Sequence, residues 1–315
     1  MGDRTGISWT NATWNPVRGC SRVSEGCRNC YAERVAWRHE HRFVEVSIDS
    51  ARTTTQTVAG PYQGLVRRGP TGPVWTGEVR FIEEALALPL RWRKPRRIFV
   101  NSMSDIFHEK VPDEWVLRIY QTMGAAHHHI YQILTKRPER MAGVLERITP
   151  ILRAEGRSDP ATWGHVHLGV SVEDQATAEA RIPLLLRTPA ALRFVSYEPA
   201  LGPVDFSRWF LCAGKVGPCS HHRPSWFIIG GESGPNARPC DLAWIRSAIA
   251  QCRAAGVACF VKQLGACPTG EWGKYEPIPL IRETATCGWV HALRDRAGAD
   301  PEEWPEDLRI QEWPQ

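Results

Sequence analysis

Three cysteines lie close together near the start of the chain. Cys20 and Cys27 are separated by six residues, and Cys27 and Cys30 by two. Thiolates are soft ligands that select zinc or iron–sulfur clusters over hard cations. A structural zinc site takes four ligands, and no fourth ligand follows at a standard zinc spacing, since the next histidines are His39 and His41. Three thiolates alone therefore favour a 4Fe–4S cluster in which one iron is left open for a small molecule.

The residues around the cysteines predict the elements that position them. Residues 12–17 are typical of a short strand, and residues 29–41 predict a helix with Tyr31, Val35 and Trp37 near one side. The cysteines would then lie in a loop at the carboxyl end of a first strand. This is where α/β barrels place their chemistry.

The motif Gly-Cys…Gly-Cys-Arg-Asn-Cys-Tyr-Ala-Glu in residues 19–33 resembles the cluster loop of the radical S-adenosylmethionine (radical SAM) superfamily. Its Cys-Tyr-Ala ending is most similar to the branch that contains DNA repair photolyases such as spore photoproduct lyase. The whole chain resembles a bacteriophage and prophage family that carries this three-cysteine motif. One departure is that the usual superfamily spacing has three residues between the first two cysteines, where this chain has six.

The resemblance implies that Cys20, Cys27 and Cys30 hold a 4Fe–4S cluster whose open iron binds S-adenosylmethionine. An external one-electron reductant would then drive cleavage of the sulfonium to a 5′-deoxyadenosyl radical. The protein would hold the cluster, orient the cofactor and exclude water. The implied reaction is repair or modification of a nucleic acid base or nucleotide.

Composition sets the broad class of the protein. At 315 residues, with 43% hydrophobic residues, the chain is long enough for one large or two small α/β domains. A formal charge of +5 permits a polyanionic partner. We expect a cytoplasmic protein with no membrane association, because no apolar run approaches a bilayer span and the N-terminus lacks a signal-peptide core. Ten cysteines in such a protein favour metal binding over disulfides.

Short apolar strands alternate with longer helices after residue 83. We expect strands at 97–101, 131–134, 166–170, 192–195, 226–229 and 258–261, and helices at 85–92, from 112, at 139–148, 176–186 and 242–255. This alternation is typical of βα units and a parallel sheet. Counting the cysteine-bearing unit, six βα units and a seventh strand predict a partial or nearly complete (β/α) barrel of the radical SAM type. A doubly wound open sheet is the alternative, because local patterns do not show whether a sheet curls.

A charged residue follows the apolar part of each of these six later strands. These residues are Asp105, Lys136, Glu173, Glu198, Glu232 and Lys262. In a barrel they converge on the rim that also holds the cysteines. We therefore expect a shared active-site rim, with Lys136, Glu198 and Glu232 as candidate catalytic residues.

The resemblance also suggests contacts to the cofactor. The strand end that contains Ser102, Ser104 and Asp105 matches the position that meets the amino group of S-adenosylmethionine. Ser171, after the fourth strand, matches the region that meets the ribose or the carboxylate. Tyr31 would pack near the adenine.

Two further groups of cysteines carry alternative interpretations. A thiol of Cys240 at the rim could donate a hydrogen atom to a substrate radical, whereas free cysteines are commonly small buried apolar residues. Cys212, Cys219 and His221, in a loop at 207–225, are a candidate zinc-ligand set with irregular spacing.

Two segments fall outside the alternation. Residues 43–77 are polar and rich in turn residues, which predicts a loop insertion after the first helix. Its Arg67 and Arg68, with Tyr62 and Trp75 nearby, could touch a nucleic acid backbone, although charge runs usually face water.

Residues 268–315 would form a C-terminal extension of a barrel that spans residues 1–267. Four tryptophans suggest that the extension packs back on the barrel: Trp272, Trp289, Trp304 and Trp313.

Two other functions remain open. One is a non-catalytic nucleic-acid-binding protein that contains zinc or an iron–sulfur cluster, and the other is a radical SAM enzyme that acts on a small molecule or a peptide. The sequence does not determine the substrate, the reductant, whether S-adenosylmethionine is consumed or regenerated, or the oligomeric state.

Overall fold

A parallel sheet of seven strands forms the centre of the computed structural model, which describes residues 5–49, 52–210, 223–273, 281–284 and 288–314. In spatial order the strands are β1 (Ala12–Trp14), β8 (Arg97–Val100), β9 (Ile130–Thr135), β10 (Val166–Val172), β11 (Leu192–Tyr197), β12 (Trp226–Gly230) and β14 (Ala258–Gln263). All six neighbouring pairs are parallel. Each strand therefore lies beside the strand of this sheet that precedes it in the sequence.

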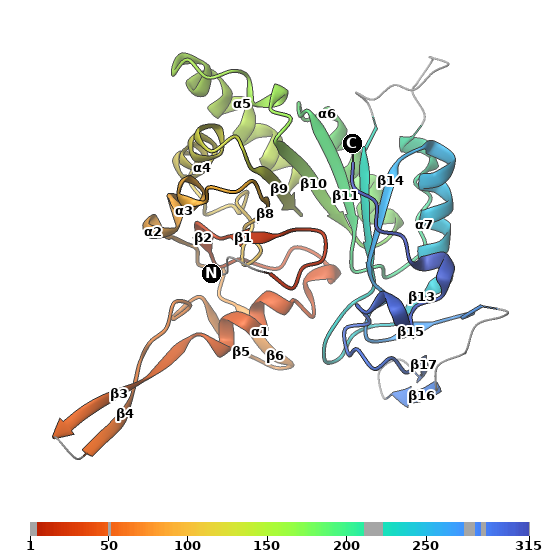
Figure 1. The fold of residues 1–315 in the computed structure, drawn as a ribbon, viewed down its shortest axis with the longest axis horizontal. Helices are drawn as coiled ribbons and strands as arrows, with labels where there is room; N and C mark the ends of the chain where they lie inside the picture. Colours follow the sequence, from red (N-terminus) through yellow and green to blue (C-terminus); the bar gives the residue numbers. More distant parts are fainter. Residues whose placement is uncertain (1–4, 50–51, 211–222, 274–280, 285–287, 315) are drawn as a thin grey trace.

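The sheet curls into a half-barrel (Figure 1). A doubly wound sheet would reverse its strand order at a switch point, whereas the order here runs in one direction from β1 to β14. The predicted partial barrel is confirmed at this level, and the doubly wound alternative is wrong.

Four long helices connect the later strands and cover the outer face of the half-barrel (Figure 1). They are α4 (Asp113–Ala125), α5 (Pro138–Ala154), α6 (Gln175–Arg187) and α7 (Leu242–Ala255). Helix α6 begins at a capping box, in which the Asp174 carboxylate accepts from the Thr177 backbone N–H at 2.8 Å. The predicted bounds of α7 match, but α5 continues beyond its predicted end at residue 148.

Aromatic side chains fill the half-barrel below the strand ends. Trp9, Phe194 and Trp226 are buried in one cluster. On its far side the C-terminal tail pairs with β14, because Phe260 forms an antiparallel bridge with Gln311. Trp313 packs edge-on against Phe260, with ring centroids 4.9 Å apart. The tail thus covers the free edge of the sheet.

The insertion after the first helix consists of two β-hairpins, so the predicted irregular loop is wrong. Strands β3 (His41–Asp49) and β4 (Arg52–Ala59) form an arm that projects from the molecule (Figure 1). Strands β5 (Val66–Gly69) and β6 (Gly72–Trp75) pack on α1 (Tyr31–Arg38). The β-branched Thr and Val residues of this segment favour strands, a signal that its turn residues obscured.

Two neighbouring elements also differ from expectation. The helix predicted at 85–92 is two short helices, α2 (Glu83–Leu86) and α3 (Leu88–Arg91). Pro89, in the first turn of α3, cannot donate the backbone hydrogen bond that would continue α2. Before them, β2 (Val17–Arg18) pairs with β7 (Arg80–Phe81).

Strands that follow β14 take part in two small sheets. Strand β13 (Cys240–Asp241) pairs with β15 (Pro268–Thr269), and β16 (Ile281–Thr284) pairs with β17 (Gly288–His291).

Most of the tryptophans predicted to pack back do so. Trp272 and Trp304 are buried, whereas Trp289 is 66% exposed, against the prediction. Among the described residues, no helix combines the length and the apolar character needed to span a bilayer.

Candidate functional site

The three cysteines of the N-terminal motif share one cavity. Cys20, Cys27 and Cys30 are free thiols in the loop between β2 and α1. All three line a cavity of about 440 Å³, and its apolar floor includes Trp9 and Phe99. The cavity lies at the carboxyl ends of the strands, the place that the sequence predicted.

Contacts of the buried Glu33 and a tight turn at Gly19 fix the shape of the cysteine loop. The Arg22 guanidinium donates to both carboxylate oxygens of Glu33 on α1, at 2.9 and 2.6 Å. Glu33 is buried and also accepts from the Trp75 backbone N–H at 3.0 Å. At the start of the loop Gly19 has φ +91°, and a Cβ there would lie 2.1 Å from the Glu78 carbonyl oxygen. The loop thus requires glycine at this position.

Asn29, between the second and third cysteines, joins the loop to the far side of the half-barrel. Its Nδ2 donates to the Glu232 carboxylate at 2.9 Å. The Arg238 guanidinium donates to the same carboxylate at 2.6 and 3.0 Å. Although burial opposes ionisation, these hydrogen bonds lower the pKa of Glu232. Glu232 therefore holds the cysteine loop as an ionised anchor.

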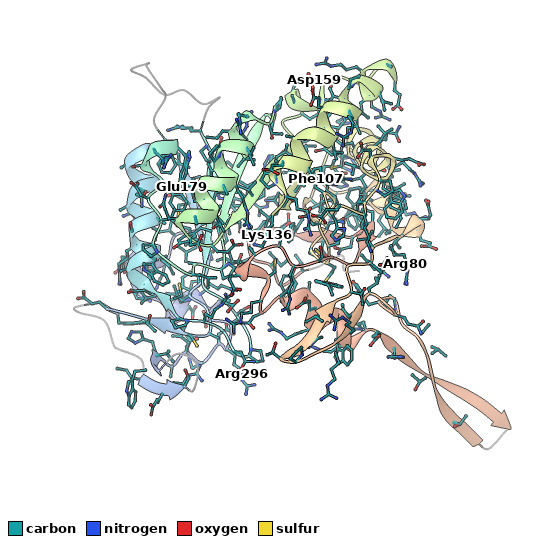
Figure 2. All side chains as sticks on the ribbon, turned by 180° about the vertical axis from the view of Figure 1, so that it is seen from behind. Arg80, Phe107, Lys136, Asp159, Glu179 and Arg296 are labelled. Carbon is teal, nitrogen blue, oxygen red and sulfur yellow. The ribbon has the colours of Figure 1, made fainter. Side chains whose placement is uncertain are left out.

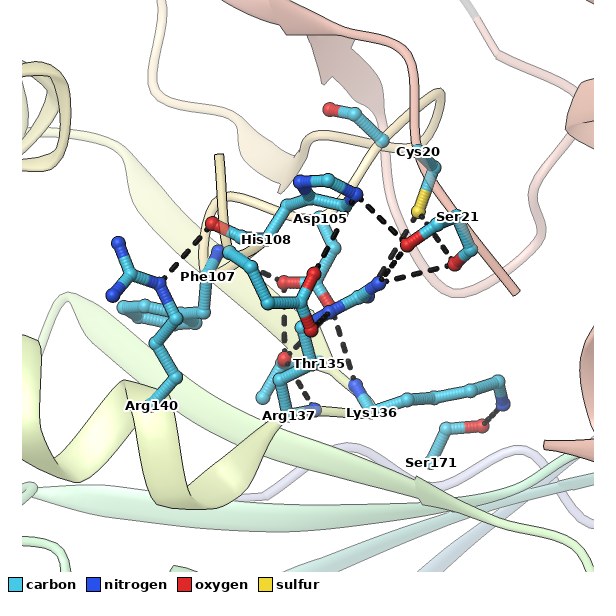
Figure 3. Close-up of polar contacts among 12 residues, drawn as sticks. Cys20, Ser21, Asp105, Phe107, His108, Thr135, Lys136, Arg137, Arg140 and Ser171 are labelled. Carbon is cyan, nitrogen blue, oxygen red and sulfur yellow. Dashed lines mark hydrogen bonds and ion pairs between the residues drawn. The ribbon is translucent and has the colours of Figure 1, made fainter. Parts of the chain in front are cut away.

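The Arg137 side chain lies beside the first cysteine (Figure 3). Its Nη1 is 3.9 Å from Cys20 Sγ and 3.2 Å from an Asp105 carboxylate oxygen. Its Nη2 donates to Ser21 Oγ at 2.8 Å. Asp105 also accepts from Thr135 Oγ1 at 2.8 Å. Asp105 thus supports Arg137, and its carboxylate is already engaged by protein donors.

A second buried charge network supports the side of the cavity formed by β9 and β10. The Lys136 ammonium donates to Ser171 Oγ and, at 2.6 Å, to the Glu173 carboxylate. Arg181 on α6 contacts the same carboxylate at 3.0 Å. Lys136 and Ser171 line the cavity, whereas Glu173 is not among its lining residues and supports them from behind.

The remaining side of the cavity carries one ion pair. The Lys262 ammonium, at the end of β14, contacts the Glu198 carboxylate, at the end of β11. Each of these side chains is about one-fifth exposed, and both line the cavity. This pair therefore faces any molecule bound above the apolar floor.

The predicted cofactor contacts gather near the cysteine loop. Tyr31 Oη donates to the Ser102 carbonyl oxygen at 2.5 Å, and Ser104 Oγ donates to the Val17 carbonyl oxygen at 2.9 Å. Asn101, which precedes them with φ +60°, donates to Ser104 Oγ at 2.5 Å. This turn holds both serines against the cysteine loop.

Most predicted site residues meet in this one cavity. Those that line it are Cys20, Cys27, Cys30, Tyr31, Ser102, Ser104, Asp105, Lys136, Ser171, Glu198, Glu232 and Lys262.

Predictions for three other groups of residues have different outcomes. Cys240 is completely buried in the main core and is not among the lining residues, so its role as a hydrogen-atom donor is not retained. Arg67 and Arg68, which could touch a nucleic acid backbone, are exposed, whereas Tyr62 and Trp75 near them are buried against α1. The candidate zinc ligands Cys212, Cys219 and His221 lie outside the described residues.

Sequence reasoning missed three polar residues of the site. They are Asn29, Arg137 and Arg238. Asn29 lies inside the cysteine motif, and Arg137 directly follows a predicted rim lysine. The motif and the strand-end pattern could therefore have indicated these two residues. Arg238 gave no such signal.

The chemistry of the donor set fits an iron–sulfur cluster. Desolvation raises the pKa of the Cys20 thiol to about 12 and also raises that of Cys30. A coordinating metal reverses this effect, because a bound thiol is deprotonated. Among the described residues, no set of three or more His, Cys, Asp or Glu side chains is arranged around a single ion. Each thiolate of a cubane cluster binds a different iron, so its cysteines need not converge on one point.

Comparison with known proteins identifies a family. Neither the curated proteins nor the solved structures include a significant match to this chain. One family model, described as "Protein of unknown function (DUF5131)", matches residues 4–300. Because this match covers nearly the whole chain, the protein belongs to the DUF5131 family.

Proposed function

We propose that this protein is a radical SAM enzyme that repairs or modifies a nucleic acid base or nucleotide. Cys20, Cys27 and Cys30 would hold three irons of a 4Fe–4S cluster. The observation that carries the proposal is that these three free cysteines share a cavity with the polar ends of the parallel strands. An arrangement that only stabilised the fold would not need this many polar side chains around an open volume.

The bound cluster and S-adenosylmethionine would supply one-electron cleavage of the sulfonium to a radical that abstracts hydrogen from the substrate. The chain itself has three tasks. The thiols, in the loop fixed by the Arg22–Glu33 pair, would hold the cluster, the strand ends would orient the bound molecules, and the floor at Trp9 and Phe99 would exclude water from below.

The cavity offers matched groups for a zwitterionic cofactor. The hydroxyls of Ser102 and Ser104 lie on the β8 side, near the cysteines, and can accept from an ammonium group. The ammonium groups of Lys136, after the neighbouring β9, and of Lys262, on β14 at the other edge of the sheet, can bind a carboxylate or a phosphate. A volume of about 440 Å³ lies within the range of small-molecule sites.

The test is the response of the reduced protein to S-adenosylmethionine. The electron paramagnetic resonance signal of the reduced cluster should change when S-adenosylmethionine is added, and 5′-deoxyadenosine should accumulate with dithionite. Protein that assembles a cluster yet shows neither response would be a binding protein or would carry out different iron–sulfur chemistry. Turnover of a small molecule or a peptide, with no effect of any nucleic acid, would retain the enzyme class and reject the substrate.

A further inference from the structure

A second concave site lies on the flank of the molecule, outside the cysteine cavity. Its volume is about 580 Å³, and three arginines line it: Arg18, Arg80 and Arg91. Arg80 lies on the side from which the β3–β4 arm projects (Figure 2). One acidic residue, Glu84, is among the described residues that line the site. Glu84 and Arg80 are both exposed. We call this site the arginine groove.

Two of these arginines lie close enough for their positive charges to repel each other. Arg18 and Arg80 are direct partners across the antiparallel β2–β7 pair, and like charges in this position repel. Among the described residues, each guanidinium donates to a neutral backbone oxygen, Arg18 to Pro61 at 3.3 Å and Arg80 to Gln63 at 2.9 Å. Within the described part of the chain, neither forms an ion pair. Although Glu84 also lines the groove, two opposed positive charges that form no ion pair with a described residue indicate a site for an anionic ligand.

The Arg18 side chain is held in position. Its guanidinium lies over the Tyr62 ring, 5.2 Å from the centroid, an arrangement that stabilises a cation. Its Nε is buried and has no hydrogen-bond partner among the residues that the structure describes. Arg18 precedes Cys20 by only two residues. A ligand in the groove would therefore contact the strand that leads into the cysteine loop.

Two arginines of the groove, Arg80 and Arg91, belong to a basic segment of the chain. Residues 60–97 carry eight Lys and Arg against three Glu, a net charge of +5 that equals the charge of the whole protein. Seven of these eight cations are arginines. Arg67 and Arg68 on β5 are exposed, as are Arg93 and Lys94 before β8. These exposed cations belong to the same basic segment of the sequence as Arg80 and Arg91 of the groove.

We propose that the arginine groove binds the phosphate backbone of a nucleic acid strand. Arginine matches phosphate oxygens with paired hydrogen bonds, and a concave site admits a narrow backbone where a flat lipid surface could not reach Arg18. This inference rests on the nucleic acid partner of the proposed function and does not depend on the cluster. It adds a docking surface separate from the cavity where a base would react.

The test compares two double variants with equal charge changes. Arg80→Glu with Arg91→Glu alters the groove. Arg187→Glu with Arg253→Glu alters exposed arginines in the last turns of α6 and α7, on the outer face of the half-barrel. Binding of labelled single-stranded DNA and RNA is titrated at several salt concentrations. Binding to phosphatidylserine vesicles and 5′-deoxyadenosine formation without substrate are measured in parallel.

The groove variant should bind nucleic acid at least 10-fold more weakly than the control variant. Its salt slope should fall by about 1.4, roughly 0.7 for each lost phosphate contact on a single strand. Its 5′-deoxyadenosine formation should be unchanged, which separates this inference from the proposed chemistry. Equal weakening in both variants, binding to vesicles in place of nucleic acid, or no nucleic acid binding by the unaltered protein at low salt would each overturn it.

Discussion

The guanidinium of Arg137 lies against the sulfur of Cys20, with Nη1 3.9 Å from Sγ. The arginine is buried and is fixed in place by Asp105 at 3.2 Å and by Glu109 at 2.8 Å. A fixed positive charge beside a cluster ligand stabilises the more negative, reduced state of the cluster, because hydrogen bonds and net charge set cluster potentials. Arg137 is therefore a positioning and tuning residue for the proposed cluster.

Replacing Arg137 tests this relationship. Arg137→Gln should shift the cluster midpoint potential to a more negative value, measured by spectroelectrochemical titration, while the iron content is retained. Arg137→Lys keeps the charge and should shift the potential less. An unchanged potential in Arg137→Gln would show that the contact is only structural.

Substitutions at two glycines can distinguish backbone strain from steric crowding at the start of the cysteine loop. Gly19 and Gly64 both have positive φ, but a Cβ at Gly64 meets no atom within 4 Å, whereas one at Gly19 meets the Glu78 carbonyl. Gly64→Ala should cost about 1 kcal/mol in the free energy of unfolding. Gly19→Ala should cost more and should also lower the iron content. Equal losses in stability and full iron content in both variants would contradict the proposed fit of the loop.

The buried Glu173 network makes a prediction about stability. Arg181→Met removes one charged partner and should lower the free energy of unfolding by about 1.5–3 kcal/mol in urea titrations. Arg187→Met, on the same helix but exposed, should change it by less than about 0.5 kcal/mol. Similar effects of the two substitutions would show that the Glu173 network contributes little.

The same network predicts a pH dependence. Burial raises the pKa of Glu173, but Lys136 and Arg181 outweigh this effect and lower it below the usual 4.5. A lowered pKa in the folded state gives stability that is present above pH 4.5 and lost as the pH falls through the folded-state pKa. Unfolding of the Arg181→Met variant should depend less steeply on pH in this acidic window. An unaltered pH profile would contradict the assignment.

Replacing Lys262, which pairs with Glu198, tests whether the rim of the cavity takes part in cofactor binding. Lys262→Met should reduce 5′-deoxyadenosine formation at least 10-fold without lowering the iron content, since Lys262 lines the cavity and the cysteines do not contact it through any hydrogen bond in the described structure. Lys110→Met, at an exposed ion pair with Glu78, is the matched control and should have no effect. If the two variants were equally active, the rim would not take part in cofactor binding.

Local sequence patterns predicted the elements of the half-barrel and the strand-end residues. The helix 242–255 has its predicted bounds, and Lys136, Glu198 and Lys262 meet in one cavity because parallel strands end on the same side. Patterns of this kind depend only on neighbours along the chain, which explains their success here.

Contacts between distant residues could not be predicted in this way. Asn29 and Glu232 are 203 residues apart, and the curl of the sheet brings them together. Arg137 contacts Cys20 across 117 residues. The β3–β4 arm was missed because the turn residues of the insertion predicted a loop, and the strand preference of its Thr and Val residues takes effect only when a partner strand pairs with them.

The most direct test of the central claim is the metal content of protein purified without oxygen. The proposal predicts a brown protein with close to four irons and four sulfides per chain, as a 4Fe–4S cluster requires. Cys20→Ala, Cys27→Ala and Cys30→Ala should each abolish the cluster, while Cys240→Ala, at a buried thiol outside the cavity, should keep it. Stoichiometric zinc without iron, in protein produced with abundant iron, would contradict the claim.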